Sequence, residues 1–259
     1  MVIFLLSRLR MKKVLIAFMG IAFSACSTDG LIPCDKEGTI GKLCREYRYL
    51  NDLPEGYVEF DQQGDSLLIS DYYNQNLRLI KTIRHQSENG QTIVISEQYP
   101  NEDSRIQTWH YNEIDSLEQI VFGANDSVVQ IDYEQGKRYR EAYLRGAELN
   151  RYFEYRYYQD DGKLYRIYAY TSTDSLLSYS QFDYFSTGQN RVSYFTSDHK
   201  LRGRRVYNSQ NGLISSIQFM DTTGTVTERA DYIYDAAFNL TEKTERKGEL
   251  TYKSVFLYY

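Results

Sequence analysis

The stretch RYFEYRYYQDDGKLYRIYAYTSTDSLLSYSQFDYF, residues 151–185, decides the fold. In its first eight residues, Phe153, Tyr155 and Tyr157 alternate with polar or amphipathic neighbours, so they share one face of an extended strand. Turn-forming residues interrupt the pattern at DDGKL and at TDSL, and each turn is followed at once by an aliphatic residue, Leu164 or Leu176. The stretch therefore predicts strands that are joined by tight turns.

The same rhythm of a turn followed by an aliphatic residue runs from Leu67 to Leu250, mostly at intervals of 9 to 16 residues. This spacing is typical of an antiparallel strand plus a turn and gives about fifteen strands. Open sheets rarely exceed roughly ten strands without curling or splitting. We predict an all-β fold over residues 46–259: a long antiparallel β-meander of repeated hairpins, curled into an open or closed barrel-like sheet.

The segment before the repeats has the features of an export signal. Lys12 and Lys13 precede an apolar run over residues 14–23, which is too short to cross a bilayer of about 30 Å as a helix. We predict that residues 1–25 are a signal peptide, with Met11 as an alternative start. The run Phe-Ser-Ala-Cys that ends at Cys26 resembles the lipobox of bacterial lipoproteins. This resemblance implies that Cys26 becomes the first residue and carries lipid; an ordinary signal peptide with a free cysteine is the alternative.

After Cys26 the chain has two further cysteines, Cys34 and Cys44. An even pair, close in sequence and in an oxidising compartment, predicts a disulfide. A metal or redox pair is the alternative, but nine residues separate the cysteines and no histidine lies nearby. We therefore expect residues 26–45 to form a lipidated tether with a disulfide.

The charge of the chain limits its partners. Removing residues 1–25 takes away four basic and no acidic residues, which changes the formal charge from −5 to −9. An acidic chain argues against nucleic acid as a partner. The predicted contacts are the membrane, through the N-terminal lipid, and a glycan, a peptide or another envelope protein.

Three segments of the body resemble a known repeat: YEQGKRYREAYLRG, YYQDDGKLYRIYAY and YIYDAAFNLTEKTE. The likeness is clearest in the last two, which place tyrosine before a turn with aspartate and then resume with an aliphatic residue. This order is similar to the YD-type repeats of RHS-like proteins, and with the lipobox it resembles an outer-membrane lipoprotein of the Bacteroidota. The repeats imply a shell, a stalk or a binding surface.

Tyrosine is unusually frequent, with 26 residues in the chain. Tyrosine has an apolar ring and a polar tip, so a cluster of tyrosines can bind sugars or peptides. The candidates for such a surface are Tyr155, Tyr157, Tyr168 and Tyr170. The alternative is that tyrosine simply suits a sheet with one wet side.

Two short patterns indicate further surface sites. Asp-Ser or Asp-Thr pairs at turns resemble the O-glycosylation site of the Bacteroidota, and the candidates are Ser66, Ser116, Ser127, Ser175 and Thr222. The alternative is that Asp-Ser only forms the turn. The basic run HKLRGRR, residues 199–205, could bind an anion, and alternation predicts that Lys200, Arg202 and Arg204 share one face.

The sequence carries none of the common local motifs of catalysis. The three histidines lie far apart, and nucleophile-elbow, zinc-protease, phosphate-loop and dinucleotide patterns are missing from the sequence. We therefore expect no enzyme activity, no cofactor and no metal site. We predict a lipid-anchored envelope lipoprotein at the outer membrane, on its periplasmic face or at the cell surface, that acts as a non-catalytic binding or structural module. The alternatives are a carbohydrate-active enzyme on an all-β scaffold and an accessory or immunity partner of an envelope complex.

Overall fold

The computed structural model describes residues 42–63, 67–88, 90–114, 116–123 and 127–258, and these residues form eighteen strands. The strands are β1 (Leu43–Leu50), β2 (Leu53–Gln63), β3 (Leu67–Asn74), β4 (Leu79–Glu88), β5 (Thr92–Gln98), β6 (Arg105–Tyr111), β7 (Leu117–Phe122), β8 (Ser127–Glu134), β9 (Lys137–Arg145), β10 (Glu148–Tyr157), β11 (Leu164–Thr171), β12 (Leu176–Tyr184), β13 (Gln189–Thr196), β14 (Leu201–Gln210), β15 (Leu213–Met220), β16 (Val226–Tyr234), β17 (Leu240–Lys247) and β18 (Leu250–Tyr258).

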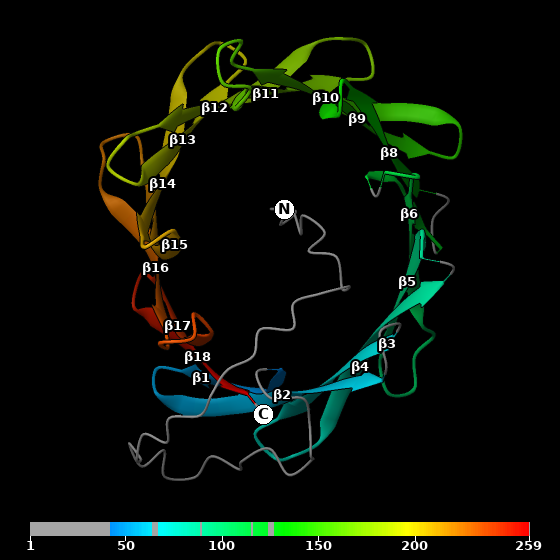
Figure 1. Ribbon diagram of the computed structural model, residues 1–259, viewed down its shortest axis with the longest axis vertical. Coiled ribbons are helices and arrows are strands. Elements are labelled where there is room, and N and C mark those ends of the chain that lie inside the picture. The colour runs from blue at the N-terminus through cyan, green and yellow to red at the C-terminus, as the bar shows by residue number, and fades with distance from the viewer. Residues whose placement is uncertain (1–41, 64–66, 89, 115, 124–126, 259) are drawn as a thin grey trace.

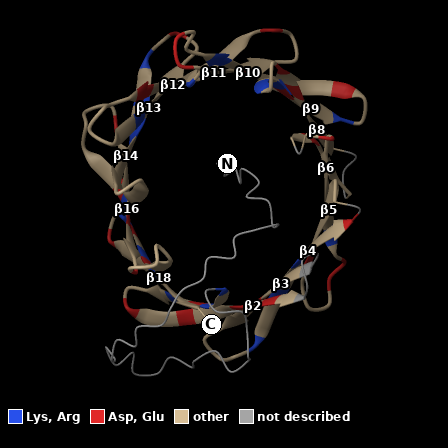
Figure 2. Ribbon diagram, in the orientation of Figure 1, with Lys and Arg blue, Asp and Glu red and all other residues tan. Residues whose placement is uncertain are grey.

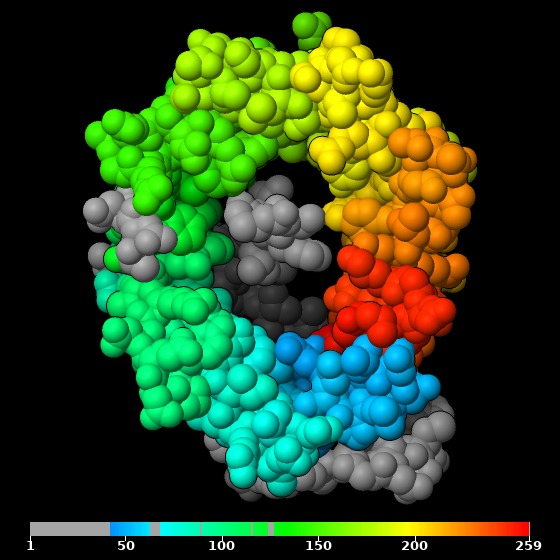
Figure 3. Space-filling view, turned by 180° about the vertical axis from the view of Figure 1, so that it is seen from behind, coloured from blue at the N-terminus to red at the C-terminus, as the bar shows by residue number. Residues whose placement is uncertain are grey.

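The strands form one closed antiparallel barrel (Figure 1). Each strand pairs with the strands before and after it in the chain, and β1 also pairs with β18, which closes the ring. The space-filling view shows this wall around a central opening (Figure 3). The predicted all-β meander is therefore confirmed, in its closed form and with more strands than the rhythm of the sequence indicates.

The barrel has two rims. We call the rim with the turns after odd-numbered strands the first rim, and the rim with the turns after even-numbered strands the second rim. The seam between β18 and β1 is fastened at the first rim, where the Asn51 amide donates to the Thr251 carbonyl at 2.7 Å and the Thr251 amide donates to Asn51 Oδ1 at 2.8 Å. This reciprocal pair of bonds joins strands from the two ends of the described chain.

A recurring turn explains the rhythm of the sequence. Asp235 Oδ1 accepts hydrogen bonds from the amides of Ala237 and Asn239, both at 2.8 Å, and Leu240 then begins β17. A side-chain oxygen in the first position accepts the same two bonds in the turns that begin with Asn74, Asn112, Thr171 and Asp221. These side-chain oxygens accept hydrogen bonds from backbone amides that have no backbone acceptor in a tight turn. The repeat in the sequence therefore depends on two residues: the one whose side chain accepts these hydrogen bonds at the start of the turn, and the aliphatic residue that begins the next strand.

Tyrosines at the ends of even-numbered strands tie the second rim together. In each case the hydroxyl donates to a backbone carbonyl near the start of the preceding strand, at 2.7–3.1 Å. The pairs are Tyr133 with Leu117, Tyr157 with Arg138, Tyr184 with Leu164, Tyr234 with Ile214, and Tyr258 with Leu240. The tyrosine of the repeat therefore has a structural role at these five positions.

The pairing register divides the side chains into two faces, because residues directly opposite each other on neighbouring strands point to the same side. A line of such partners descends from the second rim to the first as the strand number rises, through Gln119, Gln130, Ala142, Tyr152, Tyr170 and Leu176. β-strands have a right-handed twist, which tilts the strands of a barrel in one sense only. The descent of the partners therefore fixes the direction in which successive strands follow one another round the barrel. Seen from outside with the second rim uppermost, strand number increases to the right.

The hydrogen bonds of β12 then show which face is outside. The Phe185 amide donates to the Gln189 carbonyl at 3.0 Å, so Asp183, two residues earlier, also directs its amide and carbonyl toward β13. In a strand of L-residues that runs upward, these groups point to the right of an observer who faces the side chain. Because β13 lies to the right of β12 from outside, Asp183 and its register partners form the outer face. The alternate residues form the inner face, around the opening.

The outer face carries many charged side chains, and acidic and basic residues occur on strands all round the ring (Figure 2). Ion pairs cross from strand to strand on this face: Arg45–Glu59, Arg191–Asp183 at 2.9 Å, Arg246–Asp231 at 2.8 Å and Lys253–Glu242 at 2.8 Å. Charged and polar side chains therefore face whatever surrounds the barrel.

The inner face carries an apolar cluster beside its own charged groups. Ile120, Val129 and Ile131 are almost fully buried there and form a cluster. Partly buried side chains cover the cluster, namely Trp109, Leu117, Phe122, Tyr133 and Tyr143. A packed core of the described residues therefore lies on the lumen side of β6–β9.

Candidate functional site

A row of aromatic rings crosses the outer face from β10 to β13. Tyr152 stacks on Tyr170 with centroids 5.0 Å apart, and Tyr179 stacks on Phe195 at 4.7 Å; Tyr168 lies between the two pairs. The ring faces are therefore in contact with one another, which stabilises a sheet through cross-strand pairs. Burial and a hydrogen bond to Asp174 raise the pKa of Tyr152 to about 12. The row is a packed part of the wall, and its rings offer no open stacking platform.

The four tyrosines proposed from the sequence do not share one surface. Tyr168 and Tyr170 belong to the outer row, whereas Tyr155 pairs with Ile167 on the inner face. Tyr157 follows a bulge at the second rim, and its hydroxyl donates to the Arg138 carbonyl at 2.7 Å. A ligand-binding role for these four residues stays a prediction, and no single ligand could contact all of them across the wall.

A buried carboxylate lies on the inner face of β9. Glu141 is 3 % exposed, and its Oε2 accepts from Arg138 Nη1 at 2.9 Å and from the Tyr155 hydroxyl at 2.7 Å. Its Oε1 accepts from the Tyr143 hydroxyl at 2.6 Å. Burial, together with the bonds to this carboxylate, raises the pKa of Tyr143 and of Tyr155 well above the usual range. Both oxygens are occupied, so we interpret this group as a structural network.

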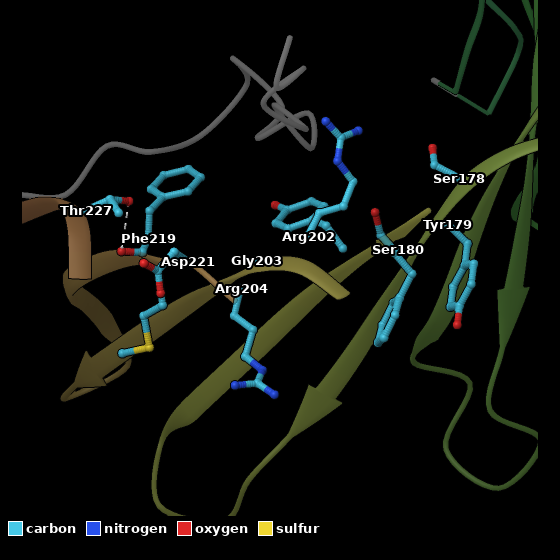
Figure 4. A pocket seen from close by; sticks show the side chains of 12 residues that line it. Ser178, Tyr179, Ser180, Arg202, Gly203, Arg204, Phe219, Asp221 and Thr227 are labelled. Carbon is cyan, nitrogen blue, oxygen red and sulfur yellow. Dashed lines mark hydrogen bonds between the residues drawn. The ribbon is translucent and has the colours of Figure 1, made fainter. Parts of the chain in front are cut away.

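A cavity of about 440 Å³ opens in the wall formed by β12–β15. On the inner face it is lined by Ser178, Ser180, Tyr194 and Phe219, with Gly203 among them. Figure 4 shows the side chains of Ser180 and Phe219 on one side of the wall and that of Tyr179 on the other. Within the described residues, the hydroxyls of Ser178, Ser180 and Tyr194 have no hydrogen-bond partner. Their hydrogen-bonding capacity is therefore open to a ligand.

A β-bulge brings an arginine to this cavity. Phe195 pairs with Leu201 and Tyr194 with Gly203, so Arg202 is the extra residue of the bulge. Figure 4 shows Arg202 on the side of Phe219, and Arg204 on the opposite side. The prediction that Arg202 and Arg204 share a face is therefore wrong, because a bulge shifts the alternation by one residue.

A second arginine, Arg205, stacks on an aromatic ring in the same region. Its guanidinium carbon lies 3.9 Å from the centre of the Phe219 ring, and Nη1 donates to the Tyr207 hydroxyl at 3.3 Å. Its Nε is buried and has no hydrogen-bond partner among the described residues. Buried donors are normally paired, so this unpaired Nε sets Arg205 apart from the paired arginines of the wall.

The remaining residues singled out in the sequence fall into two groups. Cys26, Cys34 and Ser66 lie outside the described residues, so the lipid and the disulfide stay predictions. Cys44 is buried in β1, and the half-buried Ser116 and Ser127 lie at the starts of β7 and β8. Ser175 and Thr222 are exposed in turns at the first rim.

The described residues lack two features, a cluster of metal ligands and a membrane-spanning helix. No group of three or more histidine, cysteine, aspartate or glutamate side chains is arranged so that it could hold a metal ion. No helix that could cross a membrane occurs in this part of the chain.

Comparisons with known proteins give only distant similarity. No protein-family model and no curated protein matches the sequence. A porin-like protein from Bacteroides uniformis aligns with 85% of this chain and 98% of its own, at 13% identity and a TM-score of 0.45. A solved complex, TcdB2-TccC3-Cdc42, aligns with 82% of this chain at 11% identity and a TM-score of 0.32; this chain spans 15% of that one. Both similarities lie below the level at which a common fold is established.

Proposed function

We propose that the protein is a non-catalytic binding or structural barrel of the cell envelope, tethered by lipid at Cys26, whose wall stands in water rather than in the bilayer. The observation that carries this proposal is the charged outer face. An arginine or lysine that faces lipid at the middle of a membrane barrel costs about 2–4 kcal/mol. Arg45, Arg191, Arg246 and Lys253 all lie within strands on that face.

The connections between strands support the same proposal. Both rims carry short connections, of two to six residues. Outer-membrane barrels combine short turns on one side with longer loops on the other. The charged side chains on the outer face are the reverse of a porin, where the exterior is apolar.

The exposed turns add a proposed modification. Ser175 and Thr222 each follow an aspartate in a turn, and both side chains are exposed. Asp174 also accepts the Tyr152 hydroxyl at 2.8 Å, which fixes the turn next to the outer face. We include these two positions as sites where a glycan could be attached without disturbing the sheet.

Detergent phase partition tests the proposal. The full chain is compared with a matched variant that starts at Ser27 behind a cleavable signal without a lipobox. We expect the full chain in the detergent phase and the variant in the aqueous phase, because only the lipid would hold the barrel to a membrane. The mass of the processed full chain measures acylation of Cys26 and any glycan. Partition of the variant into detergent would contradict a wall that stands in water.

A further inference from the structure

We propose that the cavity in the wall at β12–β15 binds an acidic sugar, that is, a sugar that carries a phosphate or carboxylate group, through Arg202, which lines the cavity, and Arg205, which stacks on the lining residue Phe219. This inference rests on the proposed function, because it names the ligand class of a binding barrel whose inner face meets water. The site combines the basic run at residues 199–205, the bulge at Arg202 and the cavity, and none of these three features has a role in closing the barrel.

The charge around the cavity is unbalanced. Within the described residues, neither Arg202 nor Arg205 has a carboxylate within 4.0 Å, whereas neighbouring inner-face lysines are paired, Lys247 with Glu228 at 2.9 Å and Lys243 with Glu245 at 2.9 Å. Asp221 lies beside the cavity, but its Oδ1 accepts from the amides of Thr223 and Thr225, both at 2.9 Å. The carboxylates near the cavity are therefore engaged elsewhere, and an anionic ligand would supply the missing charge.

Gly203 lies between the two arginines, where the backbone of β15 comes close to β14. A Cβ atom at this position would lie 2.7 Å from the Met220 carbonyl oxygen, so the close approach of β15 excludes any side chain. Arg202 and Arg205 are three residues apart on β14, which separates their Cα atoms by about 10 Å at 3.3 Å per residue. A sugar with one acidic group fits between two side chains at this spacing.

The groups around this space match the parts of an acidic sugar. Arg205 packs over the ring of Phe219, which restricts the guanidinium and reduces the entropy lost when it binds an oxyanion. Arg202 is exposed, so it can close over the ligand. The free hydroxyls of Ser178, Ser180 and Tyr194 can bond to sugar hydroxyls, and the ring of Tyr194 can contact the apolar face of a sugar ring.

Isothermal titration of the full mature chain in detergent tests this proposal. The probes are glucose 6-phosphate, glucuronate, neutral glucose and inorganic phosphate, at low ionic strength. The variants are Arg202→Gln and Arg205→Gln, and Arg204→Gln is the matched control because its side chain lies on the opposite side of the same strand. We expect one or both acidic sugars to bind, and each inner arginine variant to weaken that binding about tenfold, since a hydrogen bond to a charged group contributes about 1.5–3 kcal/mol. Arg204→Gln should change it less than about twofold.

Three outcomes would overturn the proposal. They are no binding of either acidic sugar to the wild type, equal weakening by Arg204→Gln, and binding of inorganic phosphate as tight as that of glucose 6-phosphate. The second outcome would indicate only the net charge of the protein, and the third would indicate a site for an ion alone. The two acidic probes distinguish a phosphate from a carboxylate source. Failure here leaves the partition result unchanged, so the two proposals can fail separately.

Discussion

Two groups of charged and aromatic side chains line the inner face of the barrel, and they differ in one respect. At Glu141, the carboxylate accepts from an arginine and two tyrosine hydroxyls, so both of its oxygens are engaged. At Arg205, the guanidinium stacks on Phe219, but its buried Nε has no partner among the described residues. The first group is fully hydrogen-bonded within the protein, whereas the second leaves one buried donor without a partner.

The difference shows why composition alone does not identify a site. Each group contains arginine, tyrosine or phenylalanine on adjacent strands, and each lies on the lumen side. A satisfied polar network fixes the local structure, whereas an unsatisfied one has a donor available for binding. We therefore expect mutations at Glu141 to reduce stability and mutations at Arg205 to reduce binding.

The largest expected effect is that of Glu141→Ala. This variant leaves Arg138, Tyr143 and Tyr155 without their shared acceptor in a buried site, and removing one partner of a buried ion pair costs about 3–5 kcal/mol. The free energy of unfolding, measured by urea denaturation, should fall by that amount. Ligand binding at β12–β15 should be unchanged wherever the variant is folded.

Glu141→Gln provides the control for this prediction. The amide oxygen can still accept from a tyrosine hydroxyl, but the charge that pairs with Arg138 is lost, so we expect a smaller loss of about 2 kcal/mol. Equal losses for the two variants would mean that packing of the side chain, and not the hydrogen-bond network, stabilises this part of the wall.

A smaller effect is expected at the adjacent rim, for Tyr157→Phe. This change removes the hydroxyl that donates to the Arg138 carbonyl at 2.7 Å, and one such bond contributes about 1 kcal/mol to stability. Tyr139→Phe is the matched control, because the Tyr139 hydroxyl has no partner in the described part of the chain and the residue is exposed. Urea denaturation of both variants measures the difference; if they are equally stable, the rim tyrosines do not fasten the strands.

The sequence predicted the β-meander because its repeat is local. Each turn carries its own side-chain acceptor, such as Asp235, and each strand alternates by itself, as Phe153 and Tyr155 do. Closure depends on a contact between β1 and β18, and no local pattern encodes such a long-range pairing. The faces were predicted correctly where the strands are regular, as for Tyr152 and Glu154 against Phe153.

The candidate site was not predictable in the same way. The basic run at residues 199–205 was visible, but the bulge at Arg202 depends on how β13 and β14 pair. Gly203 was the available signal, since an isolated glycine within a strand pattern indicates a bulge or a close approach of backbone. The tyrosine clusters were visible in the sequence but gave a misleading signal. The frequency of tyrosine does not distinguish a ring that stacks on its neighbour from a ring that is free to bind a ligand.

The smallest expected effect on stability is that of Arg205→Met. Methionine can keep the contact with Phe219 through its thioether, and the change removes a buried donor that lacks a partner. Replacing a poorly compensated buried charge with an apolar side chain is often neutral or stabilising. The free energy of unfolding should therefore stay within about 0.5 kcal/mol of the wild type or rise, while binding of an acidic sugar is lost. A loss of stability comparable to that of Glu141→Ala would mean that Arg205 is satisfied by the protein itself, and the two groups on the inner face would then be alike.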